Sequence, residues 1–269
     1  MILRVFTVSD IHQSRAHYRW LTTAVETHNP DVVAIVGDCL DFTRNRYEFS
    51  IEDCANSLSG LPVKHLVFVR GNHEDRNWWN FVYAWPFEKR PLVALYGSAF
   101  QLGPLVIVGF PCHLGDEEPW CQTLPKTGNE LSLDSSLSGR RELPHECKHW
   151  LPQLMRQLGP ASRTLWLEHE PPMTTPIATP QTFNPEWTEA IERFRPLLVI
   201  SGHDHETPKR FNAWHSKLGD TVCVNPGQSA AELHYCVLDF EFAGDEPALP
   251  RKITVAVFPW NSRTVIPPA

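Results

Sequence analysis

The sequence predicts an α/β fold with two packed sheets flanked by helices. Short apolar runs rich in β-branched residues alternate with amphipathic stretches, which is the pattern of strands connected by helices. The runs number about ten, more than one sheet comfortably holds, so we expect two sheets. The early runs, such as Val32–Val36, are apolar throughout, as expected of strands that are covered on both faces.

Each expected strand is a short, mostly apolar run bounded by polar or turn-forming residues. In chain order these runs are Leu3–Val8, Val32–Val36, His65–Val69, Leu92–Tyr96, Leu105–Phe110, Thr164–Leu167, Leu197–Ile200, Val222–Val224, Tyr235–Phe242 and Ile253–Phe258. The later runs follow one another with few helical stretches between them. This spacing favours antiparallel additions to the sheets, because antiparallel neighbours need no helical crossover.

The expected helices are amphipathic stretches that lie between these strands. They are Ser14–Thr27, Ile51–Leu58, Trp78–Ala84, Glu146–Leu158 and Pro185–Phe194. Asn184 precedes the last of them and Pro185 occupies its first position, so the sequence predicts a capped start there.

The composition is that of a globular protein with a net negative charge. The chain has 269 residues, with 31 acidic and 24 basic side chains and a formal charge of -7. A chain of this length forms roughly one or two domains, and no linker divides it, so we expect a single domain over residues 1–269. The acidic balance argues against long nucleic acid as a partner, because a phosphate backbone is bound by a basic face.

Residues 113–143 differ from the rest of the chain. They are polar, rich in Gly, Pro, Ser and Glu, and show no periodicity. A structureless stretch this long inside a domain is often functional, so we predict an insertion that forms a lid or rim, with His113 at its start. The alternative is a disordered surface insertion.

Cysteine usage and the N-terminal sequence indicate the compartment. The chain has seven cysteines with irregular spacing and no C-x-x-C, which favours neither a disulfide framework nor a zinc ribbon. The apolar start is too short for a signal peptide. No apolar run approaches the roughly 18 residues of a membrane span. We therefore expect a cytoplasmic protein with no membrane partner.

The residues whose side chains could bind a metal or act in catalysis follow the predicted strands. Five strand ends carry Asp, Asn or His, in the segments Ser9-Asp10-Ile11-His12, Gly37-Asp38-Cys39-Leu40-Asp41, Gly71-Asn72-His73-Glu74, Glu168-His169-Glu170 and Gly202-His203-Asp204-His205. Taken singly, each has an ordinary structural explanation, such as a helix cap at Asp10, a turn at Asp38 or a core histidine at His169. Their recurrence at five strand ends is not required for packing, and strand ends are where open α/β sheets bind ligands.

A mixture of imidazole and carboxylate groups suits divalent ions such as Mn, Fe, Zn or Ni. The groups are too numerous for one tetrahedral ion, whereas two ions that share a bridging carboxylate would use them all. Two metals about 3.5–4 Å apart form the clamp of phosphatases and nucleases, in which a bridging hydroxide attacks phosphorus in line.

The motif order D-x-H, G-D-x-x-D, G-N-H-E, H and G-H-x-H resembles that of the calcineurin-like metallophosphoesterase superfamily, and the turn Asn225-Pro226-Gly227 is also similar. The resemblance implies a four-layer α/β/β/α sandwich of two mixed sheets. It also implies two divalent metal ions. The first would be held by Asp10, His12, Asp38 and His205, and the second by Asp38, Asn72, His169 and His203. His73 would be the general acid, and Asp41 would orient it.

The segment His169-Glu170-Pro171-Pro172 resembles the bacterial small phosphodiesterases and phosphatases of this superfamily. Phe42 stands where the Ser/Thr protein phosphatases have a phosphate-binding arginine, which argues against a protein substrate. We therefore predict hydrolysis of a small-molecule or nucleotide phosphodiester by the metal-bridging hydroxide. A phosphomonoesterase, a nuclease and a non-catalytic scaffold are the alternatives. The sequence sets no oligomeric state.

Four aromatic residues directly follow the G-N-H-E motif, at Trp78, Trp79, Phe81 and Tyr83. Aromatic rings can stack on a nucleobase. Helical aromatic side chains more often pack against the core, so we expect these four mainly to bury the helix.

Overall fold

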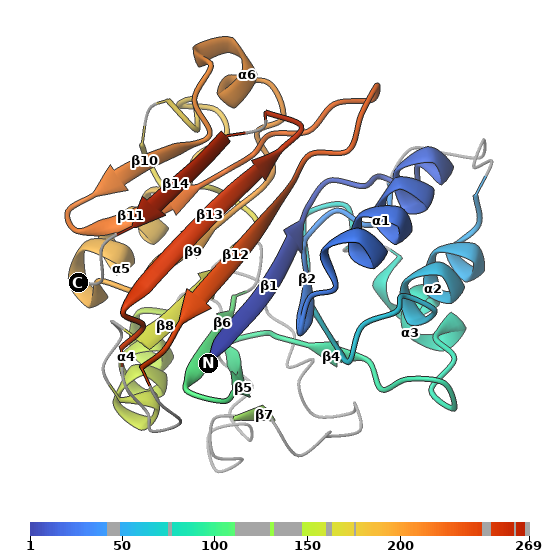
Figure 1. Ribbon diagram of the computed structural model, residues 1–269, viewed down its shortest axis with the longest axis horizontal. Coiled ribbons are helices and arrows are strands. Elements are labelled where there is room, and N and C mark those ends of the chain that lie inside the picture. Colours follow the sequence, from blue (N-terminus) through green and yellow to red (C-terminus); the bar gives the residue numbers. More distant parts are fainter. Residues whose placement is uncertain are drawn as a thin grey trace.

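Two mixed seven-stranded sheets form the centre of the part of the chain that the computed structural model describes (Figure 1). The described residues are 1–41, 49–74, 77–110, 130–131, 147–159, 163–174, 176–243, 249–260 and 262–266. The first sheet has the order β14-β13-β12-β1-β2-β3-β4 and the second the order β10-β11-β9-β8-β6-β5-β7.

The first sheet consists of β1 (Ile2–Val8), β2 (Val32–Val36), β3 (His65–Val69), β4 (Val93–Ala94), β12 (Tyr235–Glu241), β13 (Lys252–Phe258) and β14 (Ser262–Ile266). Strands β1 to β4 are parallel, and β12 to β14 add to β1 in antiparallel fashion. The predicted antiparallel additions are therefore confirmed. Among the described residues, no helix separates β12, β13 and β14.

The second sheet consists of β5 (Ser98–Leu102), β6 (Leu105–Gly109), β7 (Glu130–Leu131), β8 (Thr164–Leu167), β9 (Leu198–Ile200), β10 (His215–Leu218) and β11 (Thr221–Val224). Its inner strands β6, β8, β9 and β11 are parallel, and antiparallel β5 and β10 flank them. The parallel strands of each sheet thus end at a common edge, where predicted site residues follow them.

The helices cover the two outer faces, so the structure has four layers (Figure 1). Helices α1 (Arg15–His28), α2 (Ile51–Ser59) and α3 (Trp78–Ala84) pack on the first sheet. Helices α4 (Cys147–Leu158) and α5 (Pro185–Phe194) pack on the second, and the short α6 (Thr207–Phe211) follows β9. The predicted α/β/β/α sandwich is confirmed. No helix of the described residues has the length and apolar character needed to cross a bilayer.

Alternation along the strands explains this layering. In β2, Val32, Ala34 and Val36 face the core between the sheets, while Val33 and Ile35 face the core beneath α1 to α3. All five side chains are fully buried. A strand apolar throughout is therefore buried on both faces, as its sequence predicts.

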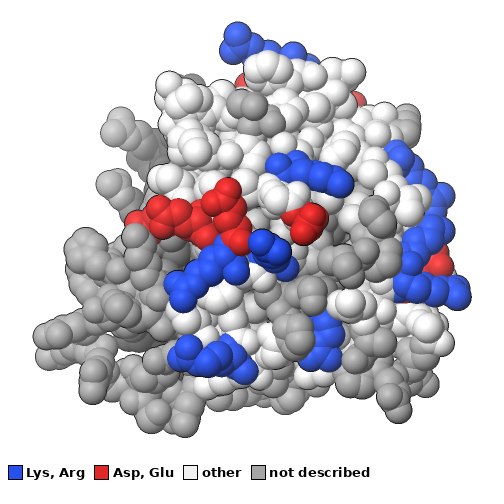
Figure 2. Space-filling view, turned by 90° about the vertical axis from the view of Figure 1, so that its left-hand side faces the viewer, with Lys and Arg blue, Asp and Glu red and all other residues white. Residues whose placement is uncertain are grey.

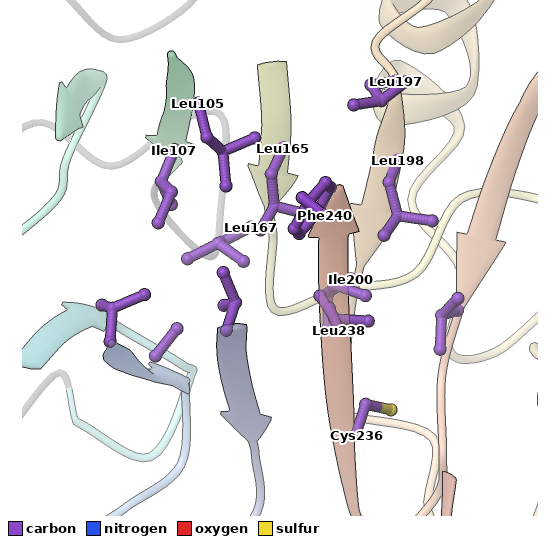
Figure 3. Packing of buried hydrophobic residues seen from close by; sticks show 14 of the residues in the cluster. Leu105, Ile107, Leu165, Leu167, Leu197, Leu198, Ile200, Cys236, Leu238 and Phe240 are labelled. Atoms are coloured by element: carbon purple, nitrogen blue, oxygen red, sulfur yellow. The ribbon is translucent and has the colours of Figure 1, made fainter. Parts of the chain in front are cut away.

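The core between the sheets is built from both of them. Figure 3 shows Leu165 of β8 lying towards Phe240 of β12, and Ile200 of β9 lying towards Leu238 of β12. This packing fixes the position of one sheet relative to the other. The predicted site residues follow strands of both sheets, so their relative positions depend on it.

Helix starts follow their sequence signals. Asn184 accepts a hydrogen bond from the Glu186 N–H, with Pro185 in the first turn, so the predicted cap is confirmed. Ser14 caps α1 in the same way, by accepting from the His17 N–H. These caps satisfy N–H groups that a helix start leaves unpaired.

The sequence missed several short elements, namely β5, β7, β10, β14 and α6, and it overestimated the strand at Leu92–Tyr96. That run shortens to Val93–Ala94 because the chain then leaves the first sheet for the second, while Leu95 remains buried between them. The missed strands β10 and β14 lie at sheet edges and carry exposed polar side chains, so no apolar run marks them.

The four aromatic residues of α3 divide into two pairs. Trp78 and Phe81 are buried as predicted, but Trp79 and Tyr83 are 41% and 83% exposed. Trp79 and Tyr83 are four residues apart, so they are neighbours on one side of the helix, and that side faces solvent. The predicted insertion at 113–143, with His113, lies outside the described residues apart from Glu130–Leu131.

Candidate metal centre

The predicted site residues meet at the edge where the parallel strands of both sheets end. Asp10 and His12 follow β1, Asp38 and Asp41 follow β2, and Asn72 and His73 follow β3. His169 follows β8, and His203 and His205 follow β9. The nine side chains therefore come from segments far apart in the sequence, and the packing of the two sheets brings them together.

The first group consists of Asp10, His12 and His205, whose ligand atoms lie within 4.8 Å of one another. His205 Nε2 is 3.1 Å from Asp10 Oδ1 and 3.2 Å from His12 Nε2. Two imidazole nitrogens and a carboxylate oxygen thus converge, and a divalent cation is one species that all three can bind.

The second group consists of Asp38, His169 and His203, again within 4.8 Å. His169 Nε2 is 3.2 Å from Asp38 Oδ2, and Asn72 Oδ1 is 3.1 Å from both His169 Nε2 and His203 Nδ1. The Asn72 amide oxygen therefore lies among the ligand atoms of this group.

His169 provides the test of whether a cation fits. Its Nδ1 lies 2.9 Å from the carbonyl oxygen of Val36, which can only accept a hydrogen bond. In the neutral ring Nδ1 therefore carries the proton, and the lone pair of Nε2 faces the oxygens of Asp38 and Asn72. Three electron-rich atoms face one another, so the arrangement requires a proton or a metal ion between them.

The close approach of carboxylates and imidazoles, together with their burial, also shifts the pKa values of these groups. Burial lowers the pKa of His169, but the Asp38 and Asp10 carboxylates outweigh it and raise that pKa to about 10. Burial raises the pKa of Asp10, but His205 and His169 outweigh it and lower that pKa well below its usual value. The pKa values of His12 and His203 are lowered by burial. His12 and His203 are thus neutral imidazoles beside ionised carboxylates, and a bound metal ion would replace the proton that His169 otherwise holds.

The backbone around the ligands is locally strained. Asp10, His12, Asp38 and His203 have φ between 49° and 63°, a region that non-glycine residues seldom adopt. Hydrogen bonds hold this geometry, since the Asp10 N–H donates to Gly37 O at 3.0 Å and the His12 N–H to Asp38 O at 2.9 Å. Such strain concentrates at functional sites, where the surrounding structure stabilises it.

The motif glycines leave room for the carboxylates. A Cβ on Gly71 would overlap the Asp38 side chain, and a Cβ on Gly202 would overlap Asp10 and Ser9. These two glycines are therefore required by close approach rather than by backbone conformation.

Glu74 is a site residue to which the sequence assigned no role. Its buried carboxylate accepts hydrogen bonds from the N–H groups of Asp38 and Leu40, each at 2.8 Å, and of Gly71 at 2.6 Å. Burial raises its pKa to about 7, and the nearby Asp38 carboxylate adds to this. Glu74 joins the loops after β2 and β3. The only sequence signal for this role was its place as the last residue of the G-N-H-E motif.

Asn225 holds the loop after β9 by hydrogen bonds, as Glu74 holds the loops after β2 and β3. Its side-chain amide donates to the carbonyl oxygens of Gly202, Asp204 and Ile177 at 3.0 to 3.2 Å. The Asn225-Pro226-Gly227 turn thereby fixes the loop that carries His203 and His205.

His73 and Asp41 form a third group with His12, whose ligand atoms also lie within 4.8 Å of one another. His73 Nδ1 is 3.2 Å from Asp41 Oδ1, and His73 Nε2 is 3.8 Å from Asp38 Oδ2. The His73 side chain is 24% exposed, so it borders the centre and also contacts solvent. Its ring centroid is 4.6 Å from that of His12.

The family is decided by a comparison with models of known families, in which the calcineurin-like phosphoesterase model matches residues 3–207. The chain belongs to the calcineurin-like phosphoesterase family. The match covers the nine residues at the strand ends and most of both sheets. Members of this family usually bind divalent metals and act on phosphate esters, so the protein is a metal-dependent phosphoesterase.

Solved structures share the fold. The chain is similar to a dimetal phosphatase from Danio rerio, with TM-score 0.66, 12% identity and 99% of each chain covered. It is also similar to the protein TT1561 of Thermus thermophilus, with TM-score 0.57, 13% identity and full coverage of both chains. A 5′-nucleotidase precursor from Thermus thermophilus has TM-score 0.51 and 13% identity, over 99% of this chain and 54% of that one. At these identities the likeness concerns the fold alone. The sequence matches no curated protein.

Proposed function

We propose that the protein hydrolyses a small-molecule or nucleotide phosphodiester at a centre of two divalent metal ions. The observation that carries the proposal is the pair of ligand groups, Asp10–His12–His205 and Asp38–Asn72–His169–His203, at one edge of the two sheets. Mn, Fe, Zn and Ni suit this donor set. When bound, such ions supply a nucleophile at neutral pH and stabilise the charge on the phosphoryl oxygens.

Asp38 is proposed as the ligand shared by the two ions. Its Oδ2 lies 3.2 Å from His169 of the second group. Its negative charge also raises the pKa of His12 in the first group, although burial there has the larger, opposite effect. A carboxylate that acts on both groups is suited to be shared by the two ions that these groups would hold.

His73 is proposed as the general acid. Its Nε2 faces the centre, 3.8 Å from Asp38 Oδ2, while its Nδ1 is held by Asp41. The Asp41 carboxylate can accept a hydrogen bond from Nδ1, which orients the ring. In this position His73 would donate its Nε2 proton to the oxygen that leaves phosphorus, so that the departing group leaves as an alcohol.

A small substrate is favoured over long nucleic acid. On the face in Figure 2, the basic side chains of the described residues form several separate groups, the largest along the right-hand edge, with acidic side chains beside some of them. Binding along a phosphate backbone needs several aligned cations. The net charge of -7 points the same way.

The function is tested with purified protein supplied with Mn²⁺, by comparing hydrolysis of bis-p-nitrophenyl phosphate and p-nitrophenyl phosphate. Cyclic and linear nucleotides follow. We expect a preference for the diester. Activity on the monoester alone would contradict the diesterase proposal, and salt-sensitive cleavage of DNA or RNA would favour the nuclease.

The metal ligands are tested with Asp38→Ala, with Asp239→Ala as a matched control. Asp239 forms an ion pair with Arg4 at 2.7 Å, away from the nine site residues. We expect Asp38→Ala to lose bound metal and turnover, and Asp239→Ala to retain both. Retention of two ions by Asp38→Ala in elemental analysis would exclude the bridge. Wild-type protein that binds no metal and shows no turnover would indicate a scaffold.

A further inference from the structure

We propose that Gln13 is a positioning residue for proton donation by His73, because it holds Asp41, the partner of that histidine. The inference rests on the proposed role of His73 as general acid. It concerns a residue outside the ligand set and outside the motif pattern.

The Gln13 side chain is buried, and both ends of its amide are used. Its Oε1 accepts a hydrogen bond from the Asp41 N–H at 3.0 Å, and its Nε2 donates to the Phe49 carbonyl oxygen at 2.9 Å. Its own N–H donates to Cys39 O at 3.1 Å, and its φ is 52°. A glutamine that folds in the left-handed region and satisfies two distant peptide groups is held in one orientation.

The Asp41 peptide is held from both sides. Gln13 binds its N–H, and Asn77 Nδ2 donates to its carbonyl oxygen at 3.3 Å. The Asp41 and His73 side chains are 23% and 24% exposed, so solvent reaches part of the pair. Hydrogen bonds to the backbone that carries them contribute to their relative geometry.

The other half of the His73–Asp41 pair is fixed separately. The His73 N–H donates to Asp38 Oδ1 at 2.9 Å, so the histidine backbone is tied to a proposed metal ligand. Gln13 ties Asp41 to the loop after β1, from which Asp10 and His12 come. Asp41 and His73 are thus both tied by hydrogen bonds to segments that carry proposed metal ligands. This fixes the position of His73 Nε2 relative to a leaving oxygen bound at the centre.

This role predicts an effect that depends on the leaving group. A departing alkoxide needs a proton, whereas p-nitrophenolate leaves without one at neutral pH. General acid catalysis contributes roughly 10²–10⁴-fold where it is needed. Misplacing the acid should remove part of that factor for alkyl esters and little of it for nitrophenyl esters.

The test compares kcat/KM of wild type and Gln13→Met on bis-p-nitrophenyl phosphate, which releases nitrophenolate, and on a dialkyl phosphodiester, from which only an alcohol can depart. Methionine has a similar volume but makes neither hydrogen bond. We expect a loss of about tenfold or more when the alcohol leaves and under about threefold when nitrophenolate leaves. Bound metal should be unchanged. Gln101→Met is the control, because the Gln101 amide binds Gly103 O on an exposed turn of β5.

Double variants separate this inference from the proposed function. If His73→Ala loses the alcohol-leaving reaction and Gln13→Met adds no further loss to it, Gln13 acts through His73. An equal loss for both leaving groups would show a merely structural role and overturn the inference. If His73→Ala leaves both reactions unchanged, the general acid assignment itself is wrong.

A second variant covers the case in which Gln13→Met does not fold. Gln13→Glu keeps an oxygen to accept from the Asp41 N–H and replaces the donor to Phe49 O with a second carboxylate oxygen. We expect it to retain the alcohol-leaving reaction to within about threefold. A loss for that reaction as large as in His73→Ala would contradict the assigned role of the Asp41 contact.

Discussion

The carboxylate of Glu74 accepts a hydrogen bond from the backbone N–H of Asp38 at 2.8 Å. Asp38 has a φ of 52°, so this contact stabilises a backbone conformation that an aspartate seldom adopts. The proposed bridging ligand is therefore held by a residue that is not itself a ligand.

Glu74→Gln is expected to weaken metal binding and lower the free energy of unfolding. The amide presents N–H where the carboxylate accepted from Asp38, Leu40 or Gly71, and each buried donor left unpaired costs about 1–3 kcal/mol. Urea denaturation and metal titration measure the two effects. Glu192→Gln, at an exposed position of α5, should change stability by less than about 0.5 kcal/mol. Unchanged metal affinity in Glu74→Gln would contradict the positioning of Asp38.

His73→Ala is expected to lose roughly 10²–10⁴-fold in kcat on esters with poor leaving groups while still binding two metal ions. The side chain contributes no atom to either ligand group, so elemental analysis should give the wild-type metal content. Kinetics and metal analysis on the same preparation check both statements. Full activity would remove His73 from the mechanism.

Gly71→Ala is expected to destabilise the protein and disturb the metal centre. The added methyl would overlap the Asp38 carboxylate and its backbone nitrogen, and overpacking of this kind costs about 1–3 kcal/mol. Thermal unfolding and metal content are the measurements. Gly60→Ala is the control, because the nearest atom to its added methyl would be Asn56 O at 3.1 Å, which requires a small shift. Equal behaviour of the two variants would argue against the tight fit at Asp38.

The metal-free protein is expected to lose stability as pH rises from about 6.5 to about 10. The usual pKa of histidine is 6.5, and the folded protein raises that of His169 to about 10. The folded state therefore binds this proton more tightly than the unfolded state. The resulting stability is complete below about 6.5 and disappears as pH passes through the folded pKa. His205, whose pKa Asp10 also raises, contributes in the same direction.

Urea denaturation in the presence of a chelator measures this effect. Histidines with lowered pKa, such as His12, are neutral in both states above pH about 6.5 and do not oppose it. Asp38→Ala should reduce the slope, because the Asp38 carboxylate is the main group that raises the pKa of His169. A midpoint that rises over this range would contradict the assignment.

The sequence predicted the site because its signals are local. A polar residue just past an apolar strand is visible without any tertiary information, and Asp10, Asp38 and His169 each lie two residues after the end of a strand. Parallel strands that end at one edge then require these side chains to converge. Strands β2, β3 and β8 were predicted with the bounds that the structure has, since each is a continuous apolar run.

Other features depend on contacts between distant parts of the chain, and the sequence shows at most that a residue such as Glu74 belongs to a motif. Glu74 and Gln13 act through hydrogen bonds to peptide groups up to 36 residues away in the chain. The edge strands β10 and β14 have polar, exposed side chains and exist because a neighbouring strand offers backbone partners. Whether Trp79 or Trp78 faces solvent depends on how α3 sits on the sheet.

The sequence by itself determined the fold class, the residues at the strand ends and the class of chemistry, because apolar runs and the side chains that follow them are properties of short segments. The tertiary structure decided how those side chains divide into two groups and which residues hold them. Distances such as the 3.1 Å from Asn72 Oδ1 to both His169 and His203 depend on the packing of one sheet against the other, which no single segment encodes.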